Sequence, residues 1–143
     1  MPNVTGKVKY VLDSYAVIAY LEAESGGSRI KELLESSDSN NPHCFMCVVN
    51  LGEVLYIVER EKSLFHAQQV ASNINDLPLE IIDADRSLTL AAAHLKARFP
   101  VAYADCFAAA LARTKNAVLV TGDPEFRKIE ADCGLRIEWL VSQ

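Results

Sequence analysis

Four acidic residues stand where they could act together on a charged substrate. Asp13 and Asp123 each follow a short apolar stretch that predicts a β-strand, and Glu53 lies in the first turns of a predicted helix. Asp105 is the only charged residue of the alanine-rich stretch 100–112. A helix that is apolar on nearly every side is a buried one, and a buried carboxylate is costly unless it is paired, protonated or bound to a metal.

Each of these residues also has an ordinary structural interpretation. Asp13 and Asp123 could be helix N-caps, a position at which aspartate is common. Glu53 could face water, and Asp105 could stay hydrated in the first turn of its helix, where its charge favours the macrodipole. In an open α/β sheet, however, ligands bind at the carboxyl ends of the strands. Because all four residues stand at such ends or one helical turn beyond, we expect them to form one site.

A cluster of carboxylates suits a hard divalent cation. Mg2+ and Mn2+ prefer oxygen ligands and often bind substrate phosphates through a few carboxylates. Two such ions about 3.5–4 Å apart can stabilise both the attacking and the leaving oxygen of a phosphodiester displacement. We expect Asp13 and Asp105 to be direct ligands, and Glu53 and Asp123 to bind directly or through water. Crowded like charges raise one another's pKa, so we expect the metal-free site to hold a proton or to be strained at neutral pH.

The elements that must position these carboxylates alternate between strand and helix. We expect strands over 7–12, 44–48, 79–82, 117–120 and 135–140. We expect helices over 15–22, 28–36, 50–60, from Ser63 to the residue before Pro78, 86–98 and 101–112, and a short one capped by Asp123 with Pro124 at its first position. This alternation predicts a parallel sheet covered by helices on both faces.

The length of 143 residues predicts a single domain over 1–143, because domains typically have about 100–200 residues. The first residues are mixed and polar, and the apolar run that follows is interrupted at Asp13, so we expect no signal peptide. We find no segment long enough to span a bilayer. We therefore expect a cytoplasmic protein that does not use a membrane.

Neither the cysteines nor the histidines predict a catalytic or zinc site. Cys44 and Cys47 have the C-x2-C spacing of zinc ligands, but no second such pair follows. Positions three apart in a strand face opposite sides of the sheet, and free cysteine is often a small core residue. The three histidines form no cluster in the sequence. We therefore expect structural thiols.

The net charge of −5 argues against a general surface for polyanions, because phosphate contacts need lysine and arginine. It does not exclude nucleic acid, since an acidic metal pocket itself contributes negative charge. It also suits a basic protein partner. The candidates for local phosphate contacts are Lys7, Lys9, Arg98, Arg113, Lys115 and Arg127.

Four segments together resemble, in order and spacing, the pattern of PIN-domain ribonucleases, and most strongly the VapC-type toxins of toxin–antitoxin pairs. They are Val-Leu-Asp-Ser at 11–14, Asn-Leu-Gly-Glu-Val at 50–54, Tyr-Ala-Asp-Cys-Phe-Ala-Ala-Ala at 103–110, and Val-Thr-Gly-Asp-Pro-Glu-Phe at 120–126. The resemblance covers essentially the whole chain. It implies a PIN-like three-layer α/β sandwich, with a mostly parallel sheet of four to five strands and helices on both faces.

The resemblance also implies a function. The chain would be a divalent-metal-dependent endoribonuclease using Mg2+ or Mn2+, and the toxin of a toxin–antitoxin pair. Its partners would be an RNA substrate, a cognate antitoxin with a basic segment that reaches the acidic pocket, and a second copy in a homodimer. The acidic quartet would be Asp13, Glu53, Asp105 and Asp123, with Ser14, Asn50 and Thr121 in supporting positions.

Two other functions remain open. A catalytically inactive PIN-like module would bind a protein partner, and failure to bind divalent metal would favour it. A phospho-acceptor domain would also place an acidic pocket around one aspartate. Receiver domains carry an early acidic pair and a late lysine, whereas this chain offers Asp13 alone and no suitably placed late lysine. Haloacid-dehalogenase phosphatases need an aspartate where Tyr15 stands, so both phospho-acceptor families are disfavoured.

Overall fold

A five-stranded parallel sheet forms the centre of the molecule. The computed structural model describes residues 8–37, 42–131 and 134–140, and within them the strand order is β3-β2-β1-β4-β5. The strands are β1 (Tyr10–Leu12), β2 (Cys44–Cys47), β3 (Glu80–Ile82), β4 (Val118–Thr121) and β5 (Ile137–Trp139). The chain builds outward from β1 in one direction and then from β4 in the other, so the switch point of the sheet lies between β1 and β4.

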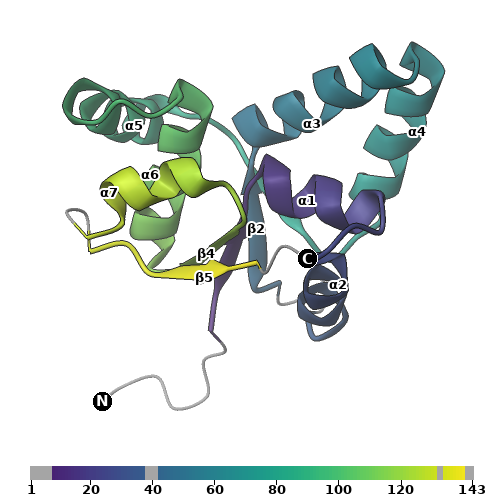
Figure 1. Cartoon of the computed structure of the whole chain (residues 1–143), viewed down its shortest axis with the longest axis horizontal. Helices are drawn as coiled ribbons and strands as arrows, with labels where there is room; N and C mark the ends of the chain where they lie inside the picture. Colours follow the sequence, from purple (N-terminus) through teal and green to yellow (C-terminus); the bar gives the residue numbers. More distant parts are fainter. Residues whose placement is uncertain (1–7, 38–41, 132–133, 141–143) are drawn as a thin grey trace.

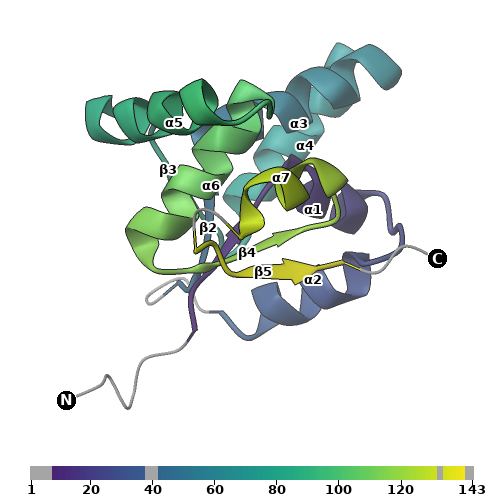
Figure 2. The same ribbon diagram turned by 60° about the vertical axis from the view of Figure 1, so that its left-hand side comes forward.

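Helices cover both faces of this sheet (Figures 1 and 2). One face carries α1 (Ser14–Leu21), α2 (Gly27–Glu35), α3 (Val48–Glu61) and α4 (Leu64–Asn75). The other carries α5 (Arg86–Arg98), α6 (Tyr103–Lys115), the short 3-10 turn η1 (Pro124–Phe126) and α7 (Arg127–Glu130). The predicted three-layer α/β sandwich is confirmed, and all the described strand pairs are parallel.

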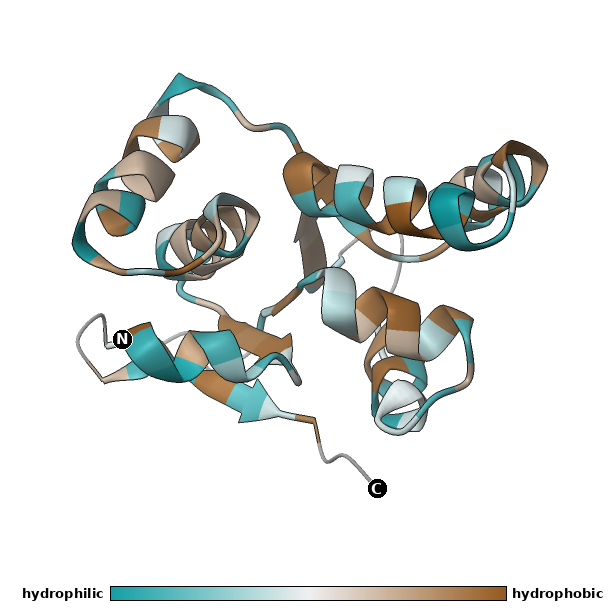
Figure 3. Ribbon diagram, turned by 45° about the horizontal axis from the view of Figure 1, so that its top comes forward, coloured by the Kyte–Doolittle hydropathy of each residue, from teal (hydrophilic) through white to brown (hydrophobic). Residues whose placement is uncertain are grey.

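Alternation along the strands divides the core in two. Val11 packs toward α5 and α6, whereas its neighbour Leu12 packs toward α1 to α4. Cys44 and Cys47 likewise enter opposite cores, as their spacing in a strand predicts. Both are buried free thiols, and Cys106 is buried as well. Hydropathy colouring shows largely apolar central strands between helices banded with polar residues (Figure 3).

Several element boundaries differ from the prediction. Val48 is not the end of a strand, because α3 begins there directly after β2, which stops pairing with β3 at Cys47. The described parts of β1 and β5 are shorter than expected, three residues each. The expected starts of two helices are confirmed, since α4 begins after Ser63 and α5 after Asp85, and each of these side chains accepts a backbone N–H of the following helix. No helix of the described residues is long and apolar enough to cross a membrane.

Two residues that bear on the sequence analysis lie where the structure gives no description. Lys7, the expected start of the first strand, lies outside the described residues, as does Cys133. His43 is buried, with its ring nitrogen 3.2 Å from the Ser36 hydroxyl, whereas His66 and His94 are exposed. The three histidines belong to different parts of the fold, with His43 before β2, His66 in α4 and His94 in α5.

Candidate functional site

Asp13 joins the end of β1 to the start of α1. Its side chain caps the helix, because Oδ1 accepts a hydrogen bond from the backbone N–H of Ala16 at 2.9 Å. Oδ2 accepts a second hydrogen bond, at 2.5 Å, from the hydroxyl of Thr121. Only 2% of Asp13 is exposed. The capping interpretation is therefore correct, yet the carboxylate is also buried at the switch point of the sheet. Ser14, the first residue of α1, lies half-buried beside it.

Thr121 links the ends of β1 and β4. This fully buried residue ends β4, and its hydroxyl both donates to Asp13 and accepts the backbone N–H of Asp123 at 3.0 Å. Asp123 is half-buried, and its Oδ1 accepts the N–H of Glu125 at 2.9 Å, which caps the turn η1. One hydroxyl thus connects two of the four predicted carboxylate residues across the switch point.

Asp105 lies in the first turn of α6 and is also buried. Only 6% of it is exposed, and it opens a run of eight buried residues that ends at Ala112. The helix begins without a side-chain cap at Ala102, so first-turn backbone N–H groups are left near the carboxylate. The alternative interpretation of Asp105 as a hydrated first-turn residue is therefore wrong, because the side chain is buried. Its predicted position in the first turn of the helix is confirmed.

Asn50 ties the start of α3 to the start of α6. Its Nδ2 donates hydrogen bonds of 3.1 Å to Oε1 of Glu53 and to the carbonyl oxygen of Ala104, the residue before Asp105. Asn50 is completely buried, while Glu53 is half-buried. The Oδ1 atom of Asn50 has no hydrogen-bond partner among the described residues. Such an unpaired acceptor is costly inside a protein.

The carboxylates lie close enough to perturb one another. Burial raises the pKa of Asp105 to about 7, and the negative charges of Asp123, Glu53 and Glu125 add to this increase. Burial is also the main cause that raises the pKa of Asp13 to about 7, opposed by its hydrogen bonds from Thr121 and Ala16 and assisted by the charges of Asp105 and Asp123. The structure therefore brings all four predicted acidic residues into one electrostatic cluster.

Glu125 is a fifth carboxylate that the sequence analysis did not include. It is half-buried, contributes to the raised pKa of Asp105, and forms an ion pair with Lys128 at 3.2 Å. A signal for it was present in the sequence, because it follows Asp123 by only two residues. Its ion pair distinguishes it from the quartet, none of whose members forms an ion pair among the described residues.

Most of the predicted basic residues do not surround this site. Arg113 and Lys115 stand near the far end of α6, about 12 Å or more along the helix axis from Asp105. Lys9 precedes β1, at the amino end of the strand, whereas the carboxylates lie at the carboxyl ends of the strands. Arg98 ends α5, just before the loop that leads into α6, and Arg127 begins α7, where its guanidinium lies over the ring of Trp139.

The donor set fits a hard cation. Its side chains supply carboxylate oxygens from four elements and the unpaired amide oxygen of Asn50, with no cationic side chain as counter-ion among the described residues. Within the same residues, no three aspartate, glutamate, histidine or cysteine side chains stand in a ready metal-binding arrangement. Both oxygens of Asp13 accept protein hydrogen bonds instead. Acceptors and negative charge are in excess, which is the condition that a bound cation relieves.

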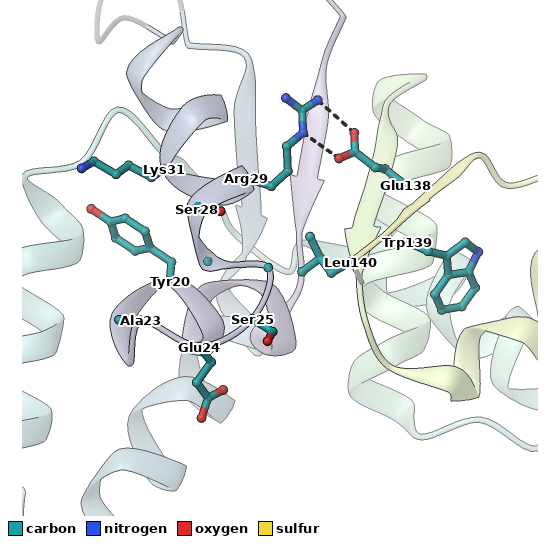
Figure 4. A pocket seen from close by; sticks show the side chains of 12 residues that line it. Tyr20, Ala23, Glu24, Ser25, Ser28, Arg29, Lys31, Glu138, Trp139 and Leu140 are labelled. Atoms are coloured by element: carbon teal, nitrogen blue, oxygen red, sulfur yellow. Dashed lines mark hydrogen bonds and ion pairs between the residues drawn. The ribbon is translucent and has the colours of Figure 1, made fainter. Parts of the chain in front are cut away.

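A pocket lies away from these carboxylates. It has a volume of about 800 Å³ and is lined by the end of α1, the start of α2 and the end of β5. Arg29 and Glu138 form paired hydrogen bonds of 2.7 and 3.1 Å at its edge (Figure 4). None of the four carboxylates lines this pocket. Its size does not make it the chemical site, because the carboxyl groups with strongly raised pKa, Asp13 and Asp105, lie elsewhere, and the raised pKa of Arg29 comes mainly from its hydrogen bond to Glu138.

Comparison with known proteins agrees with this description. The model of the PIN domain family matches residues 10–132. No curated protein sequence matches the chain. Among solved structures, VapBC2 of Rickettsia felis bound to a promoter DNA fragment has a TM-score of 0.69 and 24% identity, covering 92% of this chain and 98% of that chain. DNA-bound VapBC of Salmonella typhimurium has a TM-score of 0.70 and 21% identity over the same shares.

A third similar structure is VapC20 of Mycobacterium tuberculosis, described as a toxin that cleaves the sarcin–ricin loop. It has a TM-score of 0.67 and 18% identity, and covers 83% of this chain and 93% of that chain. The family model spans strands β1 to β4 and every one of the four carboxylates. The chain therefore belongs to the PIN domain family and has the fold of the VapC toxins.

Proposed function

We propose that this protein is a divalent-metal-dependent endoribonuclease that acts through Asp13, Glu53, Asp105 and Asp123. The observation that carries the proposal is the convergence of these carboxylates from four separate elements, two of them with a pKa raised to about 7 and none in an ion pair among the described residues. Membership of the PIN domain family supports a nuclease. The proposed cofactor is Mg2+ or Mn2+, since both prefer oxygen ligands.

Each residue has a defined part in this proposal. Asp13 and Asp105 would hold the cation directly, and Glu53 and Asp123 directly or through water. When bound, the ion supplies a water of lowered pKa and positive charge opposite the phosphate oxygens. Thr121 orients Asp13 through its 2.5 Å hydrogen bond, and Asn50 orients Glu53 through a 3.1 Å one. Ser14 offers a further hydroxyl beside Asp13.

The similar structures support a role as a toxin. Two of them are VapBC complexes, and VapC20 is described as cleaving the sarcin–ricin loop. We propose by analogy that this chain acts as one domain, cleaves RNA, is held by a cognate antitoxin with a basic segment, and forms a homodimer. The net charge of −5 and the unpaired carboxylates would attract such a basic segment.

Calorimetric titration with Mn2+ tests the metal site directly. We expect the wild-type protein to bind Mn2+ and Asp105→Asn to lose most of that binding, because the amide removes a negative charge and an anionic oxygen ligand. Asp83→Asn is the matched control. Asp83 is exposed and follows β3, two strands away from β1, so this variant should bind as the wild type does.

The titration separates the nuclease from the inactive alternative. A folded wild-type protein that binds no Mn2+ would contradict the proposed function and favour a PIN-like module for protein binding. Equal binding by the wild type and by Asp105→Asn would place the metal elsewhere. Where binding depends on Asp105, cleavage of RNA fragments with added Mn2+, and its absence in Asp105→Asn, would establish the activity.

A further inference from the structure

Charge is distributed unevenly along the chain. Residues 86–122, which form α5, α6 and β4, contain five lysine and arginine residues and one acidic residue, Asp105. The whole chain has a net charge of −5, so the residues outside this segment are strongly acidic. The five cations are Arg86, Lys96, Arg98, Arg113 and Lys115. Because α5 and α6 lie side by side on one face of the sheet (Figures 1 and 2), these cations give the surface of the two helices a positive charge.

Arg113 lies between two pockets of this surface. One pocket, of about 400 Å³, lies between α5 and α6, and its polar lining residues besides Arg113 are His94 and Thr114. The other, of about 190 Å³, lies between the end of α6 and the start of β5, and Asn116 and Arg136 line it. Because Arg113 lines both, the two pockets adjoin. We call them together the Arg113 groove, formed by the polar residues His94, Arg113, Thr114, Asn116 and Arg136.

Arg136 is held in this groove by the end of α6. Its Nη2 donates to the backbone carbonyl oxygen of Asn116 at 2.8 Å and to the side-chain Oδ1 of the same residue at 3.3 Å. Asn116 has a left-handed backbone, with φ of 52°, which ends α6 and turns the chain into β4. A guanidinium has five N–H donors, so most of those on Arg136 remain for a ligand. A side chain anchored in this way loses little conformational freedom when it binds.

The two arginines of the groove lack counter-ions. Both Arg113 and Arg136 are exposed, and neither forms an ion pair among the described residues. Arg29, by contrast, pairs with Glu138 at 2.7 Å. Arg113 stands in the last turn of α6, where a cation favours the helix macrodipole. The macrodipole does not account for Arg136, which precedes β5 and comes from a different part of the chain. The groove therefore has unneutralised donors that suit an anion.

We propose that the Arg113 groove binds the phosphate backbone of the RNA substrate, at a surface separate from the four carboxylates. The inference rests on the proposed function and adds a second contact with its substrate. The planar guanidinium matches the oxygens of a phosphate. The carboxylate site repels an RNA backbone, because both are negatively charged. A contact on another surface therefore supplies affinity and orientation that the acidic site lacks.

The distance between the two surfaces suits a folded RNA. Arg113 follows Asp105 by eight residues of α6, which is about 12 Å along the helix axis. Successive phosphates of one strand in a duplex are about 3.4 Å apart along the duplex axis. The groove therefore lies about four nucleotides or more from the carboxylates. An RNA that is held at the groove reaches the carboxylates with a different part of its chain.

The test measures binding without cleavage. A fluorescein-labelled RNA hairpin is titrated by anisotropy in EDTA, which withholds the proposed cofactor, at several salt concentrations. Arg113→Gln and Arg136→Gln should each weaken binding by roughly 3- to 10-fold at low salt, and each should lower the slope of log affinity against log salt by about 0.7–0.9. Arg113→Lys keeps the charge and should keep the slope. Arg113 forms no hydrogen bond within the described residues that its replacement would remove, so Arg113→Gln should fold as the wild type does.

A matched control removes the same charge from the opposite layer. Arg60 is exposed near the end of α3, with its guanidinium 5.2 Å over the ring of Tyr56. Arg60→Gln should leave the affinity for the hairpin within about twofold of the wild type, because salt screens distant charges. Calorimetry should give the same Mn2+ affinity for Arg113→Gln and for the wild type.

Four results would overturn the inference. The folded wild type could fail to bind the hairpin at low salt, or Arg113→Gln and Arg136→Gln could bind it with unchanged affinity and slope. Arg60→Gln could weaken binding equally, which would assign the effect to net charge alone. Unchanged RNA affinity with a changed oligomeric state in Arg113→Gln would assign the groove to a second copy. None of these results depends on Mn2+, so the metal titration tests the proposed nuclease separately.

Discussion

At the scale of single residues, the same side-chain type serves two purposes in this site. Asp13 is an ordinary N-cap by its hydrogen bond to Ala16, and an unusual acid by its burial. Asp105 combines a favourable first-turn position with a run of buried neighbours. Burial is the main cause that raises the pKa of both residues to about 7, so these two carboxyls are partly protonated near neutral pH without metal.

These pKa values predict how stability depends on pH without metal. The ordinary pKa is 3.8 and the folded value about 7, so between these values the folded chain holds protons that the unfolded chain has released. The contribution of these two groups to the free energy of unfolding therefore falls as pH rises from about 4 to 7, and it stays constant above that. In EDTA, the free energy of unfolding of Asp105→Asn should increase relative to that of the wild type as pH rises across this window, by up to a few kcal/mol.

Urea denaturation followed by circular dichroism at several pH values measures this difference. The other titrating groups are shared by both proteins, so most of their contribution cancels in the comparison. A variant that is much less stable than the wild type at pH 7 in EDTA would contradict the prediction. It would show that Asp105 has mainly a structural role.

At the scale of elements, hydrogen bonds fix the site at two junctions. The hydroxyl of Thr121 joins the end of β4 to the end of β1, and the amide of Asn50 joins α3 to α6. Both residues are completely buried, so neither bond competes with water. The alanine-rich buried face of α6 allows that helix to pack closely against the sheet and α5, which brings Asp105 toward β1.

Thr121→Val tests the junction between the strands. The methyl group keeps the volume but leaves Oδ2 of Asp13 and the N–H of Asp123 without their partner. We expect a loss of about 1–3 kcal/mol in the free energy of unfolding. The lost hydrogen bond also lowers the pKa of Asp13 in the wild type, so its removal should weaken Mn2+ binding at pH 7, and less so at higher pH.

Thr121→Ser retains the hydroxyl and is the control for this variant. It should keep most of the metal affinity and lose only the contribution of the buried methyl group to stability. Urea denaturation and calorimetry on the same samples measure both quantities. Identical Mn2+ affinities for the valine and serine variants at pH 7 would contradict a positioning role for the hydroxyl.

At the scale of the whole molecule, the fold gathers negative charge at one end of the sheet. The strand order puts the switch point between β1 and β4. Helix α3 follows β2, helix α6 leads into β4, and Asn50 joins the starts of these two helices. Arg113 and Lys115 lie at the other end of α6. The fold therefore stores electrostatic repulsion that a bound cation would relieve, which couples metal binding to global stability.

Thermal unfolding with and without Mn2+ measures this coupling. At a free Mn2+ concentration about 100 times its Kd, binding to the folded state alone adds about 2.7 kcal/mol. For a chain of this size we expect Tm to rise by roughly 5–15 °C, and excess EDTA should reverse the rise. Asp83→Asn should show the same increase as the wild type. An equal increase in Asp105→Asn would contradict a metal site at the four carboxylates.

The sequence by itself determined the order of the elements and four members of the acidic cluster. Short apolar runs alternating with amphipathic stretches predict a parallel sheet, because local hydrophobic period follows backbone geometry. The four carboxylates could be found because each stands at the end of a strand or in the first turns of a helix. The resemblance of their segments to PIN-domain ribonucleases added the family, which the comparison confirms.

Only the tertiary structure decided what surrounds those carboxylates. Three contacts depend on residues far apart in the chain: Thr121 donates to Asp13, Asn50 donates to the carbonyl oxygen of Ala104, and Tyr15 lies over Gly122. The participation of Glu125 depends on the direction in which the short turn η1 runs after Asp123. Such contacts follow from how whole elements pack, and packing has no local signature in sequence. The hydrophobic period predicts which face of each element is buried. Which other element packs against that face depends on the tertiary structure.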